Sequence, residues 1–332
     1  GNSGQSDIIQ SGTYDLDVRA GAGTNDTASQ DVATATVQDR GINGISTWTA
    51  PSSVVGQVTT AGDIRDRLGV NITQAGSIAS GDYVVHAIEV SGLEGALANK
   101  TTTTSTDTDD FLNIQAISPG GSGEDVVKML IGQANAQKNR DPKYWSPDVT
   151  AAQGWDATGN LTVIADTEND TYYAMVDMGN AYFTRTGAVT ALGGAATESA
   201  PANGDQFATN FSVYNYNVDD NNYGLVSENE DGEFTAETVL GIWAFQTAQA
   251  TVTTDRGDMV RVQQEDNETI RGTTNVAPGT SLSVRVQTKE GATNAFLLPQ
   301  TVTAGAGTDS KRIDKATVKE IWLSSVPVRR RP

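Results

Sequence analysis

The chain has 332 residues, with 41 acidic and 22 basic side chains, and its formal net charge is −19. It contains no Cys and a single His, which excludes disulfides and thiolate chemistry and disfavours a zinc site or a His-based triad. The negative charge excludes nucleic acid as a partner, and no apolar run reaches the roughly 20 residues of a transmembrane span.

The net negative charge also predicts the salt concentration in which the protein is stable. Self-repulsion of this size destabilises a compact chain in dilute buffer, whereas in molar salt the Debye length falls to about 3 Å and the repulsion is screened. No basic residue lies between Arg185 and Arg256. We therefore expect a protein adapted to very salty water; the alternative is an acidic soluble protein of ordinary media.

Alternating, Val- and Thr-rich runs predict half-buried strands along the whole chain. In chain order they are Thr13–Val18, Val32–Val37, Tyr83–Val90, Leu161–Ala165, Tyr172–Val176, Gln206–Tyr214, Ser281–Gln287 and Ala295–Thr303. Clusters of Gly, Asn, Asp and Pro separate them, as turns require. Many strands at short spacing predict an all-β protein built of β-sandwiches.

One or two short helices are expected among the strands. Gly62–Leu68 has apolar residues at helical spacing. Glu124–Gln137 begins with acids, has an apolar middle and is followed by basic residues, which suits the helix dipole. Thr101–Thr106 is rich in hydroxyls and is expected in a loop.

Composition divides the chain into four segments. Residues 1–39 hold two strands, too few for a stable sheet, so they must complete a sheet elsewhere. They extend this chain's own fold, or they complete a sandwich of a preceding domain or of a neighbouring subunit. Residues 40–200 are expected to form a β-sandwich with an inserted short helix, and residues 201–310 a second sandwich unit. Residues 311–332 would add a C-terminal strand and a basic tail around Arg329–Arg331.

Acidic clusters are the candidate metal sites, since hard cations such as Ca²⁺ or Mg²⁺ prefer carboxylate oxygens. The alternative is a solvated acidic surface. The clusters are Asp107, Asp109 and Asp110; Asp166, Glu168 and Asp170; Asp219 and Asp220; and Glu228, Glu230 and Asp231. None of them matches an EF-hand loop. No catalytic residue is predicted, and His86, which alternates with apolar residues, is interpreted as a packed side chain.

Seven Asn-x-Ser/Thr sequons are candidate N-glycosylation sites if the chain is secreted. Their acceptors are Asn25, Asn71, Asn99, Asn160, Asn169, Asn210 and Asn267. The five Trp residues are scattered along the chain, which favours core packing over a sugar-binding platform.

Several strings, in order, resemble the surface-glycoprotein domain (BGTF) of haloarchaeal S-layer and related cell-surface glycoproteins. They span residues 45–305, most of the chain. They are Ile45–Pro51, Gly81–His86, Ser91–Leu97, Glu168–Asp177, Gly204–Val213, Asn275–Thr280, Ser283–Arg285 and Ala295–Leu298.

The resemblance implies tandem immunoglobulin-like β-sandwich domains, export to the cell surface, N-linked glycans and cation-supported self-assembly. We therefore expect a structural, non-enzymatic extracellular glycoprotein of a halophilic archaeon that associates with copies of itself in an S-layer-like lattice or a filament. The chain departs from the family in lacking a Thr-rich stalk and a C-terminal membrane segment. A secreted or surface adhesin, or a carbohydrate-binding module, is the alternative, and a hydrolase with paired carboxylates is a third class.

Overall fold

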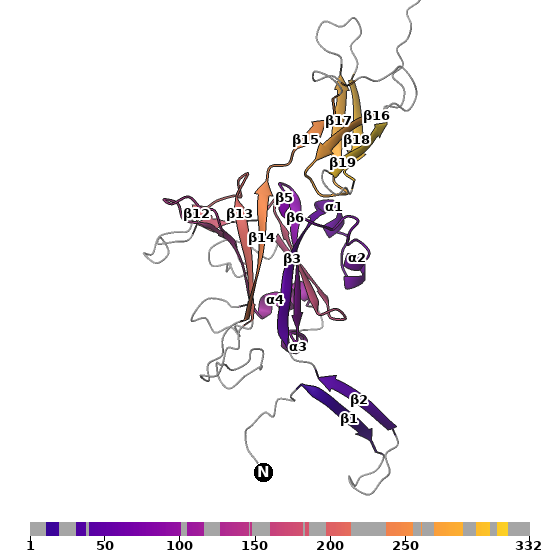
Figure 1. Cartoon of the computed structure of the whole chain (residues 1–332), viewed down its shortest axis with the longest axis vertical. Helices are drawn as coiled ribbons and strands as arrows, with labels where there is room; N and C mark the ends of the chain where they lie inside the picture. Colours follow the sequence, from indigo (N-terminus) through magenta and orange to yellow (C-terminus); the bar gives the residue numbers. More distant parts are fainter. Residues whose placement is uncertain are drawn as a thin grey trace, which may run out of the picture.

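The computed structural model describes residues 11–19, 31–37, 40–100, 105–115, 127–145, 147, 160–181, 183–185, 197–213, 237–254, 260, 269–287, 297–305 and 311–317. Strands dominate these residues and the helices are short, which confirms the all-β class predicted from the sequence. Figure 1 shows three parts in series: an N-terminal hairpin, a central unit and a C-terminal unit.

The strands of the hairpin and the central unit are β1 (Gly12–Val18), β2 (Asp31–Val37), β3 (Gly41–Pro51), β4 (Thr73–Gln74), β5 (Ser77–Ala79), β6 (Asp82–Ser91), β7 (Val127–Gln133), β8 (Lys143–Trp145), β9 (Leu161–Asp166), β10 (Thr171–Asp177), β11 (Thr184–Arg185), β12 (Thr197–Glu198), β13 (Gln206–Val213) and β14 (Glu237–Gln246). Those of the C-terminal unit are β15 (Ala250–Val252), β16 (Thr269–Thr274), β17 (Ser281–Gln287), β18 (Leu297–Thr303) and β19 (Lys311–Thr317). The helices are α1 (Ser52–Val55), α2 (Ala61–Arg65), α3 (Glu94–Lys100) and α4 (Asp107–Asn113).

Two sheets face each other in the central unit. One has the order β4-β3-β6-β10-β9 and the other β12-β11-β8-β7-β13-β14-β5, antiparallel throughout except for β14 with β5. Their inner faces share one apolar core that includes Ile88, Tyr172, Phe207, Phe211 and Trp243. The central unit is therefore a β-sandwich, as the alternating strands predicted.

The five-stranded sheet is covered on both faces. Its second face, with Val85 and Met175, packs against Val54 of α1 and Ile64 of α2 in a separate apolar cluster. A strand buried on both faces reads as a continuous apolar run rather than an alternating one. This explains why β10 is buried from Thr171 to Val176.

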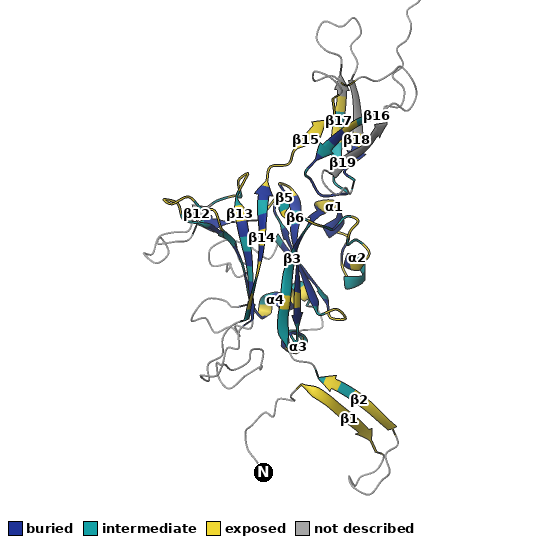
Figure 2. Cartoon of the chain, viewed as in Figure 1, coloured by how far each residue is buried: buried dark blue, intermediate teal, exposed yellow. Residues whose placement is uncertain are grey.

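The hairpin β1–β2 has one apolar face and one polar face. Its register pairs Tyr14 with Ala35 and Leu16 with Ala33 on one face, and Asp15 with Thr34 on the other. Every residue of β1 is exposed, and β2 is exposed over most of its length (Figure 2). The apolar side chains of this hairpin therefore face solvent in the single chain.

The C-terminal unit contains a three-stranded sheet, β15-β16-β19, and a two-stranded sheet, β17-β18. Asp82, the buried first residue of β6, joins this unit to the central one. Its carboxylate accepts the backbone N–H of Ala277 at 2.6 Å and the hydroxyl of Thr280 at 3.4 Å. Ala79 packs with Val276 beside it. The junction is therefore a packed contact in addition to a chain connection.

The structure differs from the expected domain boundary at residue 200. β13 and β14 lie in the same sheet as β7 and β8, so the sheet runs across that boundary. The next unit begins after Gln246, where β14 ends. Residues 199–205 therefore connect β12 and β13, two strands of one sheet, and do not link two domains.

The predicted helix at Glu124–Gln137 is wrong, because Val127–Gln133 forms strand β7. Its side chains alternate between buried Val127, Met129 and Ile131 and less buried neighbours, and the strand pairs with β13. Two-sided pairing in a sheet overrides the charge order that suits a helix. The helix predicted near Gly62–Leu68 is confirmed as α2, and the described residues include four short helices where one or two were expected.

Candidate functional site

His86 lies fully buried between the two sheets of the central unit. Its Nε2 is 3.0 Å from Oγ1 of Thr209, which also accepts the indole N–H of Trp243 at 2.9 Å. Burial lowers the pKa of His86 to about 3. The ring is neutral near pH 7 and closed off from solvent, which confirms the interpretation of His86 as a packed residue.

The first acidic cluster is divided among separate structural roles. Asp109 accepts the backbone N–H and the hydroxyl of Thr106 and so caps α4, and these hydrogen bonds lower its pKa. Asp107 accepts the backbone N–H of Ala165 at 2.9 Å, which ties α4 to β9. Asp110 is buried, and these three carboxylates are not among any group that could hold a metal ion. These carboxylates therefore do not point to a common centre.

The second acidic cluster lies next to a basic side chain of the protein itself. Arg65 of α2 reaches Glu168 at 2.7 Å and lies 3.7 Å from the buried Asp166. Asp166 also accepts the side-chain amide of Asn169 at 2.9 Å. Asp170 has a positive φ of 49°, which places it in the turn between β9 and β10. The guanidinium of Arg65 therefore lies close to both carboxylates and offsets their negative charge.

Among the residues that the structure describes, no group of three or more His, Cys, Asp or Glu side chains could hold a metal ion. The remaining predicted ligands lie outside the described residues, and the prediction for them stands as made. They are Asp219, Asp220, Glu228, Glu230 and Asp231.

The sequons fall in different settings. Asn169 is exposed at the turn between β9 and β10, Asn160 directly precedes β9, and Asn99 lies in α3. Asn71 is half-buried beside the C-terminal unit, where a Cβ added at Gly279 would approach its Nδ2 to 2.7 Å. Asn210 lies in β13. Asn25 and Asn267 lie outside the described residues.

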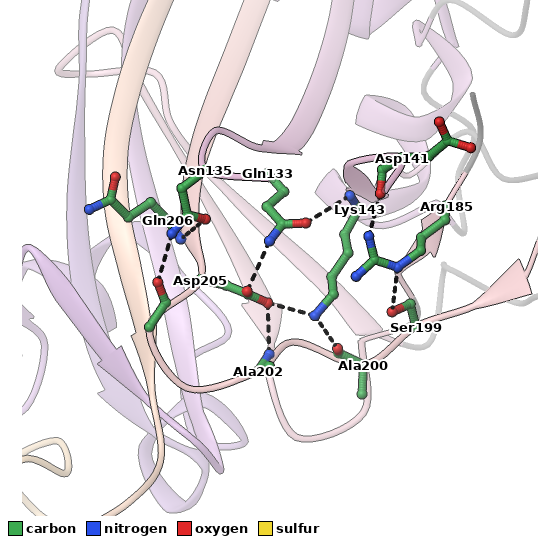
Figure 3. Close-up of polar contacts among 11 residues, drawn as sticks. Gln133, Asn135, Asp141, Lys143, Arg185, Ser199, Ala200, Ala202, Asp205 and Gln206 are labelled. Atoms are coloured by element: carbon green, nitrogen blue, oxygen red, sulfur yellow. Dashed lines mark hydrogen bonds and ion pairs between the residues drawn. The ribbon is translucent and has the colours of Figure 1, made fainter. Parts of the chain in front are cut away.

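A buried ion pair near the edge of the seven-stranded sheet was not predicted from the sequence. Lys143 of β8 pairs with Asp205 at 2.6 Å and donates to the carbonyl of Ala200 at 2.7 Å. Asp205 also accepts the side-chain amide of Gln133 and the backbone N–H of Ala202 (Figure 3). The ammonium and carboxylate satisfy one another and local backbone groups, so this cluster fastens β7, β8 and the turn before β13 rather than forming an open reactive site.

Two of the Trp residues, Trp145 and Trp243, are buried in the core of the central unit. Trp48 is half-buried and donates its indole N–H to the hydroxyl of Ser46. These three side chains therefore do not form an exposed sugar-binding platform. Within the described part of the chain, no helix is long and apolar enough to cross a membrane.

The described residues form an all-β protein whose polar groups hold the fold together. Comparison with known proteins finds relatives that match most of the chain. The chain is 28% identical over 310 residues to a cell surface glycoprotein of Haloferax gibbonsii, covering 93% of this chain and 30% of that protein. It is 26% identical to cell surface glycoproteins 1 and 2 of Haloarcula hispanica, over 315 and 312 residues.

The chain is thus similar along nearly its whole length to haloarchaeal cell-surface glycoproteins, which confirms the resemblance drawn from its motifs. The two Haloarcula matches include 93% and 92% of this chain, but only 31% and 30% of the Haloarcula proteins. The chain therefore spans less than a third of the length of each relative. No family profile matches the sequence, and no solved structure gives a significant match.

Proposed function

We propose that this chain is a structural segment of an extracellular cell-surface glycoprotein of a halophilic archaeon. The observation that carries the proposal is the match along nearly the whole chain to three haloarchaeal proteins of that description. The acidic composition supports it, because a net charge of −19 is tolerated best where salt screens it. The serial arrangement of β-units in Figure 1 supports a structural role.

The segment associates with copies of itself in a lattice or a filament, and Ca²⁺ or Mg²⁺ stabilises contacts between the negatively charged subunits. The physical reason is that like-charged surfaces approach closely only when cations neutralise them. The carboxylates proposed for this role include those between Asp219 and Asp231, outside the described residues. N-linked glycans occupy a subset of the sequons.

Electron microscopy of the purified chain in 2–3 M salt (roughly the range in which charge is fully screened), with Ca²⁺ and then with a chelator, tests the assembly. We expect ordered arrays or filaments that dissolve when the divalent ion is removed. A monodisperse monomer that is indifferent to the metal would refute self-assembly. It would favour an adhesin, against which the burial of Trp145 and Trp243 counts.

The hairpin β1–β2 is the proposed point of contact with a preceding domain or a neighbouring subunit. Its exposed apolar face, with Leu16 and Val18, gives it surface to bury, and two strands alone are marginal. Deleting residues 1–38 should abolish the ordered arrays while leaving the central unit folded. Unchanged arrays after the deletion would remove the hairpin from the assembly contact.

A further inference from the structure

The outer face of the seven-stranded sheet exposes apolar side chains in its middle. Alternate residues of β14 turn inward to the core, such as Trp243, and leave Leu240 and Ile242 outside with 55% and 66% of their surface exposed. Side chains directly opposite each other on paired strands lie on the same face. In this register Asn210 of β13 faces Leu240, and Ala208 faces Ile242.

Asn210 also belongs to this outer face. Its neighbours in β13, Thr209 and Phe211, are fully buried, so Asn210 points away from the core between them. On its other side it pairs with Leu130 of β7, which is only partly buried. Asn210 thus lies next to Leu130, Leu240 and Ile242 on the outer face of this sheet.

In salty water this outer face is prone to association with other apolar surfaces. Molar salt screens the charge repulsion that keeps acidic proteins apart, but it does not weaken attraction between apolar surfaces. Adjoining exposed apolar side chains on a flat sheet are a site of association unless something covers them. The acidic composition of the chain therefore does not protect this particular face.

The amide of Asn210 is held in one orientation. The hydroxyl of Ser212, the third residue of the sequon, donates to Oδ1 of Asn210 at 2.8 Å and lies 2.8 Å from Oγ1 of Thr238. Because Oδ1 is fixed towards Ser212, Nδ2 points the other way, and it makes no hydrogen bond to any residue that the structure describes. By contrast, Nδ2 of Asn169 donates to Asp166 at 2.9 Å.

We propose that Asn210 carries an N-linked glycan that covers Leu240 and Ile242 on the outer face of this sheet. This inference rests on the proposed function as a surface glycoprotein and assigns one site and one role to its glycans. The donor is a glycosyl phosphate of the lipid-linked class. Nδ2 attacks the anomeric carbon, the N–C bond forms and the C–O bond to phosphate breaks. The phosphate leaves with the bonding electrons, and the amide loses one proton.

The burial of Ser212 determines whether the glycan is attached before or after β13 pairs with β14. Ser212 is 4% exposed, and its hydroxyl lies between Asn210 and Thr238 of the adjacent strand. An enzyme that reads the sequon hydroxyl cannot reach it once β13 has paired with β14. The glycan is therefore attached before these two strands pair, and the sheet then closes with the sugar on its outer side.

Peptide mass spectrometry of the chain, secreted from a haloarchaeal host, tests the site. Because no Lys or Arg lies between Arg185 and Arg256, trypsin yields one peptide of residues 186–256, in which Asn210 is the only sequon. We expect this peptide to carry a glycan mass that is lost in Asn210→Gln. An unmodified peptide with glycans at other sequons overturns this inference alone. Glycans at none of the sequons overturn the glycoprotein proposal as well.

Hydrophobic-interaction chromatography at high salt tests the covering role. Asn210→Gln should elute later than the unaltered chain, and adding Leu240→Thr and Ile242→Thr to it should restore the earlier elution. The matched control is Thr171→Ala, which removes the sequon of Asn169 at the β9–β10 turn and should not shift elution. Equal elution of Asn210→Gln and the unaltered chain, with both folded by circular dichroism, would overturn the covering role.

Discussion

At the scale of single residues, His86 makes the stability of the central unit depend on pH. Its folded pKa of about 3 lies below the ordinary value of 6.5, so as pH falls the unfolded chain binds the proton first. The contribution of neutral His86 to the free energy of unfolding is therefore present above pH 6.5 and is lost as pH falls towards the folded pKa. Because His86 is the only His, this loss can be assigned to one side chain.

We expect the free energy of unfolding to fall by about 2 kcal/mol between pH 6.5 and pH 5, which follows from about 1.4 kcal/mol per pH unit for a single group. His86→Gln keeps a polar side chain at this position but cannot bind the proton. Its unfolding free energy, measured in denaturant at fixed high salt, should be nearly constant over this range. An equally steep profile in the variant would assign the loss to other groups.

The ion pair of Lys143 and Asp205 should respond to mutation differently from surface charges. Asp205→Asn leaves a buried ammonium without its counter-charge and should cost about 3–5 kcal/mol, with little dependence on salt because buried pairs are poorly screened. The control is Glu168→Gln, whose 74% exposed side chain should contribute less than about 1 kcal/mol. Denaturant unfolding at two salt concentrations checks both. A loss that vanishes at high salt would contradict the buried-pair description.

At the scale of elements, short helices in this fold depend on their caps. Thr106 and Asp109 form a reciprocal capping box at the start of α4, and the same arrangement with Thr60 and Asp63 starts α2. A helix of seven residues has too few internal hydrogen bonds to persist by itself. Its cap and the burial of Phe111 in the main core therefore decide whether it forms.

Thr106→Ala should lower the free energy of unfolding by about 1 kcal/mol, the usual loss for an N-cap hydroxyl. Thr106→Ser retains the hydroxyl and should lose much less. Equilibrium unfolding of the two variants side by side measures the difference. Equal losses would mean that the methyl group, rather than the cap, contributes the stability.

The strands could be predicted because the alternation of apolar and polar residues reflects the burial of one face of each strand. Ser281–Gln287 is a strand with the predicted bounds, and Thr13–Val18 and Leu161–Ala165 differ from theirs by one residue. The charges that flank the segment at Val127 favour a helix, whereas its partner strand is distant in sequence: Val127 pairs with Val213, 86 residues later. Long-range pairing leaves no local signal.

The polar sites were less predictable than the fold. The burial of His86 followed from its apolar neighbours in the strand, but the pairing of Lys143 with Asp205 joins residues 62 positions apart. Arg65 likewise neutralises Asp166 and Glu168 from a distant helix. An acidic cluster in a sequence therefore predicts negative charge but not the cation that balances it.

At the scale of the whole molecule, the junction at Asp82 fixes the C-terminal unit against the central one. Asp82→Ala leaves the buried N–H of Ala277 without this acceptor, and loss of the contact should let the two units reorient. Because the chain has no Cys, spin labels can be placed at the exposed positions Ser53 and Thr301 by single substitutions to Cys.

Pulsed electron paramagnetic resonance between these two labels should give one narrow distance distribution in the unaltered chain and a broad one in Asp82→Ala. The control is Glu89→Ala, an exposed side chain on the same strand, which should leave the distribution narrow. A narrow distribution in Asp82→Ala would show that the apolar contact of Ala79 and Val276 is sufficient to hold the junction.

The way the chain enters and leaves the central unit also determines how it bears mechanical load. The chain enters from the hairpin through β3 and leaves for the C-terminal unit through β14, and both strands run along the long axis in Figure 1. Hydrogen bonds in a sheet lie across its strands, so tension between the two ends pulls β3 and β14 along their partners in shear. Many hydrogen bonds must then break together rather than one after another. The central unit should therefore resist stretching more strongly than an arrangement whose hydrogen bonds open one at a time.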